Sequence, residues 1–392
     1  MKRTIMGLSL MLMACAPLAA QTAAPTDSAK AEQKPKFSIK PTGRILMDGA
    51  LYFGDRDREF VDGVAIPDVR IGVKAGYGKW KAKVDIGYSY GKVSLKDLFV
   101  EYDFNEHNLL RAGNFVHQFG LQSATSSSMK VTMEEPTSNE IFNNPRLIGL
   151  MYVFDKGDYF ATASAHVESD ALKYTSNQLG KTGYGFMSRL VYRPMHETGR
   201  VLQVGFSGGF STPRYNSEAD RNHKSFVLSA NFPTRVSKVT ALEAIVPDAK
   251  NLFKFTPEFL GCYGPVALET QYYYLQINRN NSLHRYNASG FYAFVRGLVL
   301  GGDYEYSHAD AGLATPRPRS LECVVGYNYT DMVDRNAGVY GGRLNDASVT
   351  FNYYINKYMI ARLRYSYTNA KSRAGMPDQH VNTIQARFQI IF

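Results

Sequence analysis

The sequence predicts an all-β fold, a transmembrane antiparallel β-barrel, on three observations. Runs of about ten residues alternate apolar and polar side chains with a period of two, as the tilted strands of a membrane barrel do. Short connections between these runs alternate with long ones, and the 392-residue chain ends on an alternating run that closes with an aromatic residue. Frequent tyrosine (27), phenylalanine (23) and glycine (33) favour strands, interfacial aromatics and tight turns over helices.

The first residues predict export from the cytoplasm. Lys2 and Arg3 precede an apolar run, and small residues lead up to Gln21, which is the pattern of a secretory signal peptide over residues 1–20. Residues 21–36 are rich in Ala, Thr, Lys and Pro and show no periodicity, which predicts a disordered periplasmic lead-in. Residues 37–392 are then the barrel.

The strands are recognised by their alternation. Residues 69–76, 80–88, 346–355 and 359–368 each place apolar side chains at every second position, with charged or small residues between them. Successive side chains of a strand point to opposite faces, so each run has one lipid-compatible face and one polar face. Aromatic residues fall toward the ends of these runs, where the headgroup region of a bilayer favours them.

The connections set the strand count. Short turns assigned to the periplasm and long loops assigned to the outside give sixteen strands, with both chain ends inside. Residues 223–246 could hold one more strand pair, so eighteen is the alternative. A closed barrel leaves no unpaired edge in lipid, so the last strand should pair with the first near residues 43–53. The long loops are 54–63, 116–146, 169–182, 211–250, 279–286, 332–343 and 370–380.

The last strand, residues 381–392, is the clearest of the set. Ile384, Ala386, Phe388, Ile390 and Phe392 form its apolar face. The opposite face, with Gln385, Arg387 and Gln389, is predicted to point into the lumen. We interpret the terminal Phe392 as an assembly signal, since bacterial outer-membrane barrels end on such a strand.

Charge and cysteine usage exclude several classes of function. The net charge of +10 is compatible with an anion pathway, but no basic run, zinc motif or recognition-helix pattern supports nucleic-acid binding. Cys262 and Cys323 are too isolated for a metal motif, and they could either pair or be ordinary small side chains. We expect no metal and no cofactor.

Three blocks of the sequence resemble the phosphate-selective porin O and P family. They are the segments 93–97, 111–115, 119–121 and 125–134, the segments 341–346, 351–356 and 384–389, and more weakly 258–265. The resemblance implies a sixteen-stranded, usually trimeric porin of the bacterial outer membrane. It also implies that the third long loop, here 116–146, folds into the lumen, and that basic residues select anions such as phosphate.

Two departures bear on the selectivity that the resemblance implies. Residues 116–118 read Val-His-Gln where the family often has a lysine and a proline, and Glu135 stands where it often has a basic residue. Both changes remove positive charge near the expected constriction. We therefore expect passive diffusion of small, preferentially anionic solutes, with phosphate-like anions among the candidates.

The inward faces of the predicted strands carry the candidate pore-lining residues. A basic lumen raises the local concentration of anions and repels cations. The alternative is a water-filled lumen whose basic residues simply balance its acids. The carboxylates of the third loop, Glu134, Glu135 and Glu140, either oppose this charge or fix the loop to the wall. The anion-binding candidates are Arg70, Lys74, Lys81, Lys83, Lys130, Arg189, Arg362, Arg364 and Arg387.

Two other classes of protein stay open as alternatives. One is a structural or adhesive barrel with a plugged lumen, which the long loop 211–250 would serve. The other is a barrel enzyme, which we do not expect because no nucleophile motif accompanies any of the eight histidines. The expected partners are small anionic solutes, outer-membrane lipid and lipopolysaccharide, the barrel-assembly machinery and two further copies of the chain in a homotrimer.

Overall fold

A computed structural model describes residues 36–143, 146–168, 172, 175, 181–213 and 224–392. The predicted signal peptide and nearly all of the predicted lead-in lie outside the described residues, as do parts of the loops 169–182 and 211–250. No helix in the described ranges has the length and apolar character needed to cross a membrane.

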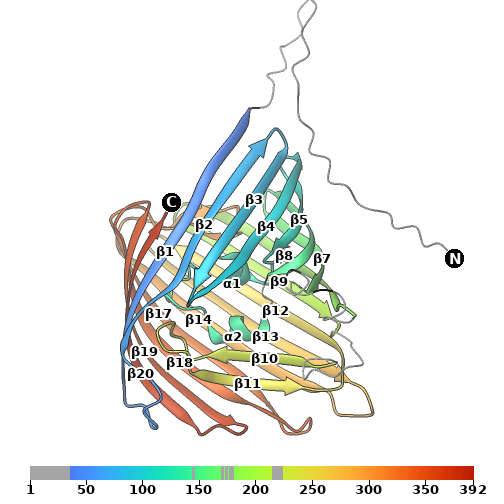
Figure 1. The fold of residues 1–392 in the computed structure, drawn as a ribbon. Coiled ribbons are helices and arrows are strands. Elements are labelled where there is room, and N and C mark those ends of the chain that lie inside the picture. The colour runs from blue at the N-terminus through green and yellow to red at the C-terminus, as the bar shows by residue number, and fades with distance from the viewer. Residues whose placement is uncertain (1–35, 144–145, 169–171, 173–174, 176–180, 214–223) are drawn as a thin grey trace, which may run out of the picture. The chain divides into compact units, whose positions relative to one another are not determined.

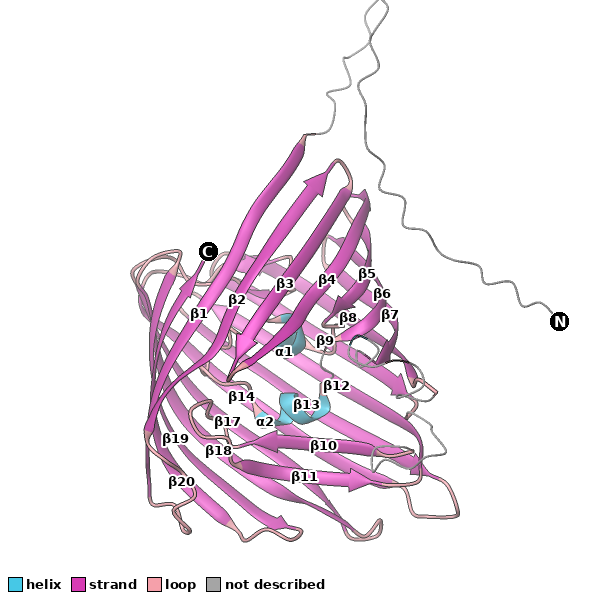
Figure 2. Ribbon diagram, in the orientation of Figure 1, coloured by secondary structure: helices cyan, strands magenta, loops and turns pink. Residues whose placement is uncertain are grey.

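The strands close into one antiparallel barrel, as Figures 1 and 2 show. This confirms the predicted fold class. The barrel strands in the described part of the chain number sixteen and pair in chain order. They are β1 (Phe37–Phe53), β2 (Gly63–Tyr77), β3 (Trp80–Ser89), β4 (Lys92–Asn105), β5 (Asn108–Phe115), β6 (Leu147–Lys156), β7 (Tyr159–Glu168), β8 (Tyr184–Glu197), β9 (Arg200–Ser211), β12 (Ala249–Tyr263), β13 (Val266–Arg279), β14 (Tyr286–Leu300), β17 (Ser320–Asp334), β18 (Val339–Tyr354), β19 (Met359–Arg373) and β20 (Gln379–Ile391).

The alternative of eighteen strands is wrong for a specific reason. The extra pair exists as β10 (Phe226–Asn231) and β11 (Thr240–Val246), but these two strands bond only to each other. Pro233, in the turn between them, accepts hydrogen bonds from the inward-pointing side chains of Arg364 and Gln385. The hairpin therefore lies inside the barrel rather than in its wall.

The last strand closes the barrel against the first. Residues Arg44 to Phe53 of β1 pair with Ile391 to Asn382 of β20. The predicted facing of β20 holds, because Gln385 and Gln389 are buried inside the barrel while Ile384 is 40% exposed on the outside. Beyond the strand, Phe392 and Gly43 exchange two backbone hydrogen bonds of 2.8 and 3.0 Å.

Deletion of Phe392 should impair barrel formation, because it removes both bonds of the final pair and the ring beside Gly43. A Cβ atom at Gly43 would meet that ring at 2.4 Å, so the two residues are fitted to each other. The measurement is the fraction of heat-modifiable protein in isolated outer membranes. Phe392→Tyr is the matched control, and wild-type yield from the truncated chain would contradict the role of Phe392 as an assembly signal.

We call the barrel end that carries Lys36 and Phe392 the inner end, and the opposite end the outer end. Among the described residues, three connections turn into the lumen. The constriction loop, residues 116–146, leaves the outer end of β5 and contains α1 (Leu121–Ala124) and α2 (Thr137–Phe142). The lumen hairpin, residues 224–248, carries β10 and β11. The inner strap, residues 301–319, joins β14 to β17 and carries β15 (Tyr306–Ser307) and β16 (Gly312–Leu313).

The sequence pattern does not predict the inner strap, because it assigns short turns to the inner end. Its position is fixed by polar contacts with the wall, since Arg189 donates to the carbonyls of Asp310 and Ala311. Its apolar contacts reach the constriction loop, because Tyr306 and Leu313 pack against the cluster that contains Leu121. The strap therefore supports the constriction loop from the inner end.

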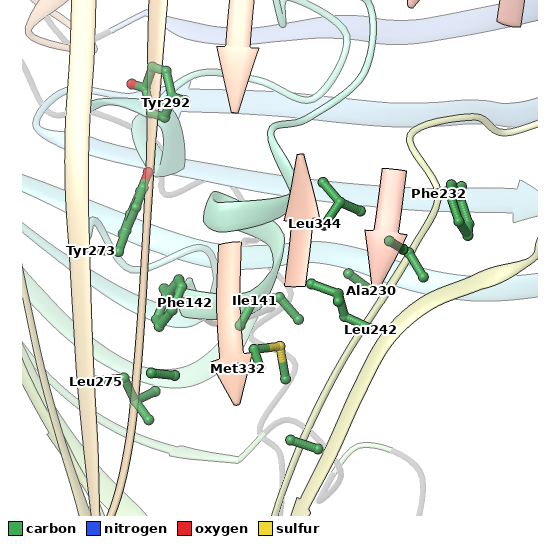
Figure 3. Packing of buried hydrophobic residues seen from close by; sticks show 14 of the residues in the cluster. Ile141, Phe142, Ala230, Phe232, Leu242, Tyr273, Leu275, Tyr292, Met332 and Leu344 are labelled. Atoms are coloured by element: carbon green, nitrogen blue, oxygen red, sulfur yellow. The ribbon is translucent and has the colours of Figure 1, made fainter. Parts of the chain in front are cut away.

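One side of the lumen is filled by an apolar cluster. Ile141 and Phe142 of α2, together with Phe232 and Leu242 of the lumen hairpin, pack against inward side chains of the wall such as Tyr273 (Figure 3). Burying such side chains stabilises the fold by about 1.5–3 kcal/mol each. The strands from β12 to β20 thus face protein rather than water over much of their inner surface.

Candidate functional site

The open space of the lumen lies on the other side, against β1 to β5. It is a cavity of about 1620 Å³, lined by the inner faces of these strands and by the constriction loop. Of the residues that the structure describes, eleven lysine and arginine residues and six aspartate and glutamate residues line it. We call its strand-borne cations the basic wall: Lys40, Arg44, Arg70, Lys74, Lys81, Lys83, Lys96 and Arg111.

Five of the nine predicted residues line this cavity: Arg70, Lys74, Lys81, Lys83 and Lys130. Several have a carboxylate partner. Lys83 lies 2.7 Å from Asp85 and 2.6 Å from Asp97, and Lys81 lies 2.6 Å from Asp103. These carboxylates lower the net charge of the lumen but leave it basic.

The cations of the basic wall stand directly opposite one another. Lys40 of β1 is in register with Lys74 of β2, and Lys74 is in register with Lys83 of β3. In a second row, Arg44 is opposite Arg70. Like charges directly opposite on neighbouring strands repel and destabilise a sheet. Two of these side chains, Lys40 and Lys74, are exposed to the lumen and form no ion pair with any carboxylate in the described part of the chain.

Lys96 extends the basic wall deeper into the lumen. Its aliphatic chain lies over Gly87, where a Cβ atom would meet the Lys96 Cε at 2.5 Å. The glycine thus leaves the space that Lys96 occupies. Within the described residues Lys96 has no carboxylate within ion-pair distance, so its charge adds to those of Lys40 and Lys74.

A row of hydroxyl groups on the constriction loop faces the arginines of the basic wall. Arg44 donates to the hydroxyl of Ser127 at 2.8 Å and to that of Ser126 at 3.4 Å, and it also pairs with Asp68. Arg70 donates to the same Asp68 at 3.1 Å. Asp68 thus holds two guanidinium groups beside the loop, while the hydroxyls supply further hydrogen-bonding groups to the cavity.

The other four predicted residues point inward but do not line the cavity. Arg189, Arg362, Arg364 and Arg387 are at most 4% exposed. Arg362 donates to the carbonyls of Ser128 and Lys130 and so holds the constriction loop. Arg364 holds the lumen hairpin. These guanidinium groups tie the wall to the loops, and we propose that they hold the loops in place and do not line the anion path.

The acidic residues of the constriction loop have different roles. Glu134 accepts from Arg235 of the lumen hairpin and from Arg387 of the wall. Burial alone would raise the pKa of Glu134, but these two cations hold it below its usual range. Glu134 is therefore an anchor. Glu135 partly neutralises Lys130 at 3.6 Å and accepts from Asn139.

Glu140 lines the cavity. The side chain is exposed, yet the barrel encloses it, and this desolvation together with the nearby carboxylate of Glu135 raises the pKa of Glu140 to about 8. At neutral pH this carboxyl group is mostly protonated and leaves the basic charge of the lumen undiminished.

Sequence reasoning missed four members of the basic wall, which are Lys40, Arg44, Lys96 and Arg111. The signal for the first two was present, since Lys40, Thr42 and Arg44 alternate with apolar residues at the start of β1. Lys96 was hidden by the register shift between Val84 and Ile86 in the pairing of β3 with β4. Such a shift is not visible as a break in a sequence pattern.

Comparison with known proteins shows a match to one protein family and to solved barrel structures. Residues 39–392 match the family model described as phosphate-selective porin O and P. No match was found among curated protein sequences. Similar solved structures include a loop-deletion mutant of the outer membrane protein OmpT of Vibrio cholerae, with a TM-score of 0.60 at 9% identity, covering 91% of this chain and 99% of that one.

Two further structures are similar to this chain. One is a trimer form of OmpT from Vibrio cholerae, with a TM-score of 0.55 at 9% identity, covering 91% of this chain and 99% of the other. The second is an anion-selective porin from Comamonas acidovorans, with a TM-score of 0.56 at 11% identity, covering 91% of this chain and 100% of the other. At these sequence identities, the similarity concerns the fold alone.

Proposed function

The chain belongs to the phosphate-selective porin O and P family, and we propose that its channel passes small anionic solutes along the basic wall. It is a porin of the bacterial outer membrane. The observation that carries the preference for anions is the row formed by Lys40, Lys74 and Lys83, in which like charges face each other across two strand pairs. An anion between such charges relieves their repulsion, and the narrow lumen concentrates it there.

General anion passage is a better fit to the constriction than strict phosphate selectivity. Gln118 accepts a hydrogen bond from Arg189 at 3.1 Å, so this departure from the family pattern serves a buried tie. Glu135, the second departure, offsets the charge of Lys130. Phosphate-like anions stay among the proposed solutes, since the guanidinium groups of Arg44 and Arg70 match their geometry.

Planar-bilayer conductance tests the proposal. The triple variant Lys40→Gln, Lys74→Gln, Lys96→Gln should lower the ratio of anion to cation permeability by about threefold or more, because fixed lumen charges set local ion concentrations. Lys357→Gln is the matched control, since Lys357 is a lysine of the inner-end turn between β18 and β19. An unchanged reversal potential in the triple variant would remove these lysines from the path.

A silent bilayer would instead favour the plugged structural barrel. The cavity of about 1620 Å³ beside the basic wall supports the open channel against that alternative. We also infer that the protein is a channel rather than an enzyme. The family assignment supports this inference, and a catalytic activity of the purified barrel on any solute that it passes would overturn it.

Selectivity should depend on pH through Glu140. Because its pKa is raised to about 8, the carboxyl group is neutral below that pH and negatively charged above it. The anion-to-cation permeability ratio should therefore fall as the pH rises from about 6 to about 9, because Glu140 gains a negative charge over this range. Glu140→Gln should make the ratio flat over this range. A pH dependence that persists in Glu140→Gln would assign the effect to another group.

We further propose a homotrimer whose contacts involve the outer face of β1 to β5. This face is aliphatic and strongly exposed in the single chain, with Ile71 at 68%, Ile86 at 51% and Val93 at 72%. An apolar face of this kind can contact either lipid or another subunit, and the trimer form of the structurally similar OmpT supports the assembly. Native electrophoresis after mild detergent extraction measures the assembly, and a monomer as the sole species would contradict it.

A further inference from the structure

On the lipid-facing surface of β17 to β20, tyrosines lie at the level of the membrane interface that is nearer to the outer end of the barrel. Tyr327, Tyr365 and Tyr367 point outward and are 40–45% exposed. The hydroxyl of Tyr327 donates to Asn345 at 2.6 Å, and that of Tyr365 donates to Asn382 at 2.8 Å. Both asparagines lie closer to the outer end than the rings. Each tyrosine thus has an apolar ring toward the hydrocarbon and a polar group toward the headgroups, as interfacial aromatics do.

A charged row lies just beyond these asparagines. Asp331 of β17 is opposite Arg343 of β18, and Arg343 is opposite Lys371 of β19. All three side chains face outward, because they alternate with inward residues such as Leu344 and Ala370. The row therefore stands at the headgroup level of the outer leaflet, in the part of the barrel where β17 to β19 approach their outer turns (Figure 1).

The carboxylate of this row does not neutralise both cations. Asp331 accepts the Nε hydrogen of Arg343 at 2.9 Å, and it also accepts the hydroxyl of Tyr329 and the backbone N–H of Val333. Lys371 is exposed and forms no ion pair with a carboxylate of the described residues. Two cations directly opposite each other repel, and this repulsion is relieved by an anion between them.

We propose that Arg343 and Lys371 bind the phosphate of a phosphorylated glycolipid in the outer leaflet. Asp331 accepts the Nε hydrogen of Arg343, whose side chain is 42% exposed, and the two terminal nitrogens form a planar fork that fits phosphate oxygens. Lys371 adds a second, mobile point charge. This site is on the outer surface and goes beyond the proposed channel function, since no solute in the lumen reaches it.

The surroundings favour a lipid over free phosphate. Toward the membrane centre from the charged row, Tyr327, Tyr367, Tyr365 and then Val325 expose 40, 41, 45 and 54% of their surface on the same outward face. An acyl chain covers such a surface, whereas inorganic phosphate leaves it bare. The same molecule therefore satisfies the cations with its headgroup and the apolar strip with its chains.

The test uses the full-length barrel, purified in detergent, and bis-phosphorylated lipid A as the probe. Native mass spectrometry should show that Arg343→Gln combined with Lys371→Gln lowers the affinity by roughly tenfold or more, on the scale of the contribution of basic residues to anionic-lipid binding. Dephosphorylated lipid A should bind wild type and the double variant equally weakly. Lys357→Gln, with its lysine at the inner end of the β18–β19 hairpin, should bind as wild type does.

Two further measurements keep the proposal falsifiable. Heat-modifiable mobility and single-channel conductance should be unchanged in the double variant, and Arg343→Lys combined with Lys371→Arg should retain lipid binding. Equal binding of lipid A by wild type and a folded double variant would overturn the site. Competition by inorganic phosphate as effective as that by lipid A would also overturn it, because the acyl chains would then contribute nothing.

Discussion

Replacing Arg387 by methionine should loosen the constriction loop and raise single-channel conductance, without the loss of anion preference expected of a pore-lining cation. The Arg387 side chain is fully enclosed and forms two bonds of 2.6 and 2.7 Å to Asp48. It also donates at 2.7 Å to Glu134 and to the carbonyl of Met133 in the constriction loop. One guanidinium group thus joins the closing strand, the first strand and the loop.

The expected loss of stability in Arg387→Met follows from the buried carboxylates that the substitution leaves without their partner. Asp48 and Glu134 would be buried with fewer cations, and removing one partner of a buried ion pair typically costs about 3–5 kcal/mol. The loop would give way before the barrel does, because it can swing away and hydrate Glu134 while the strands keep their backbone ladder. Arg235, at 3.0 Å from Glu134, would tie Glu134 to the lumen hairpin alone, while Arg362 would still hold the loop at Ser128 and Lys130.

The measurements for Arg387→Met are single-channel conductance, current noise and the temperature at which heat-modifiable mobility is lost. Conductance and noise should rise and the temperature should fall. The matched control is Lys74→Gln, which should change the reversal potential without lowering the stability, since Lys74 is exposed to the lumen and opposite two other lysines. If Arg387→Met instead lowered anion preference at constant conductance, Arg387 would belong to the path and not to the anchor.

Replacing Arg189 by alanine should release the inner strap and destabilise the barrel by about 3–5 kcal/mol. Arg189 pairs with Glu258 at 2.7 Å, and both side chains are 0% exposed. It donates at 3.1 Å to the carbonyls of Asp310 and Ala311 in the strap and to Gln118 at the start of the constriction loop. Without it, Glu258 is buried with only Gln203 as a donor among the described residues.

A double variant separates the strap from the stability of the wall. Arg189→Met combined with Glu258→Met removes both buried charges, and such apolar replacements of a buried pair are often neutral or stabilising. The double variant should regain much of the melting temperature that Arg189→Ala loses. The carbonyl of Asp310 would still lack its donor, although that of Ala311 would keep Gln203 at 2.9 Å, so both variants should show raised conductance. Wild-type conductance in the double variant would mean that the apolar contacts of the strap hold it without Arg189.

The sequence determined the wall of this protein. Alternation with a period of two, ten-residue runs and a terminal aromatic strand predicted a closed barrel of sixteen strands, and the facing of β20 was predicted residue by residue. This is local information, because a strand shows its two faces in every pair of neighbouring residues. The inward direction of Arg70, Lys74, Lys81 and Lys83 followed from the same rule.

Only the tertiary structure decided what occupies the lumen, and hence which inward cations meet the solute. Arg189, Arg364 and Arg387 have the same alternation signal as Arg70, yet loops distant in sequence cover them. The two-residue alternation shows on which face of a strand a side chain lies. It contains no information about a loop that returns from a hundred residues away. Those long-range contacts divide the barrel into one half that is filled by protein and one half that is open along the basic wall. They therefore also determine the proposed path of the anion.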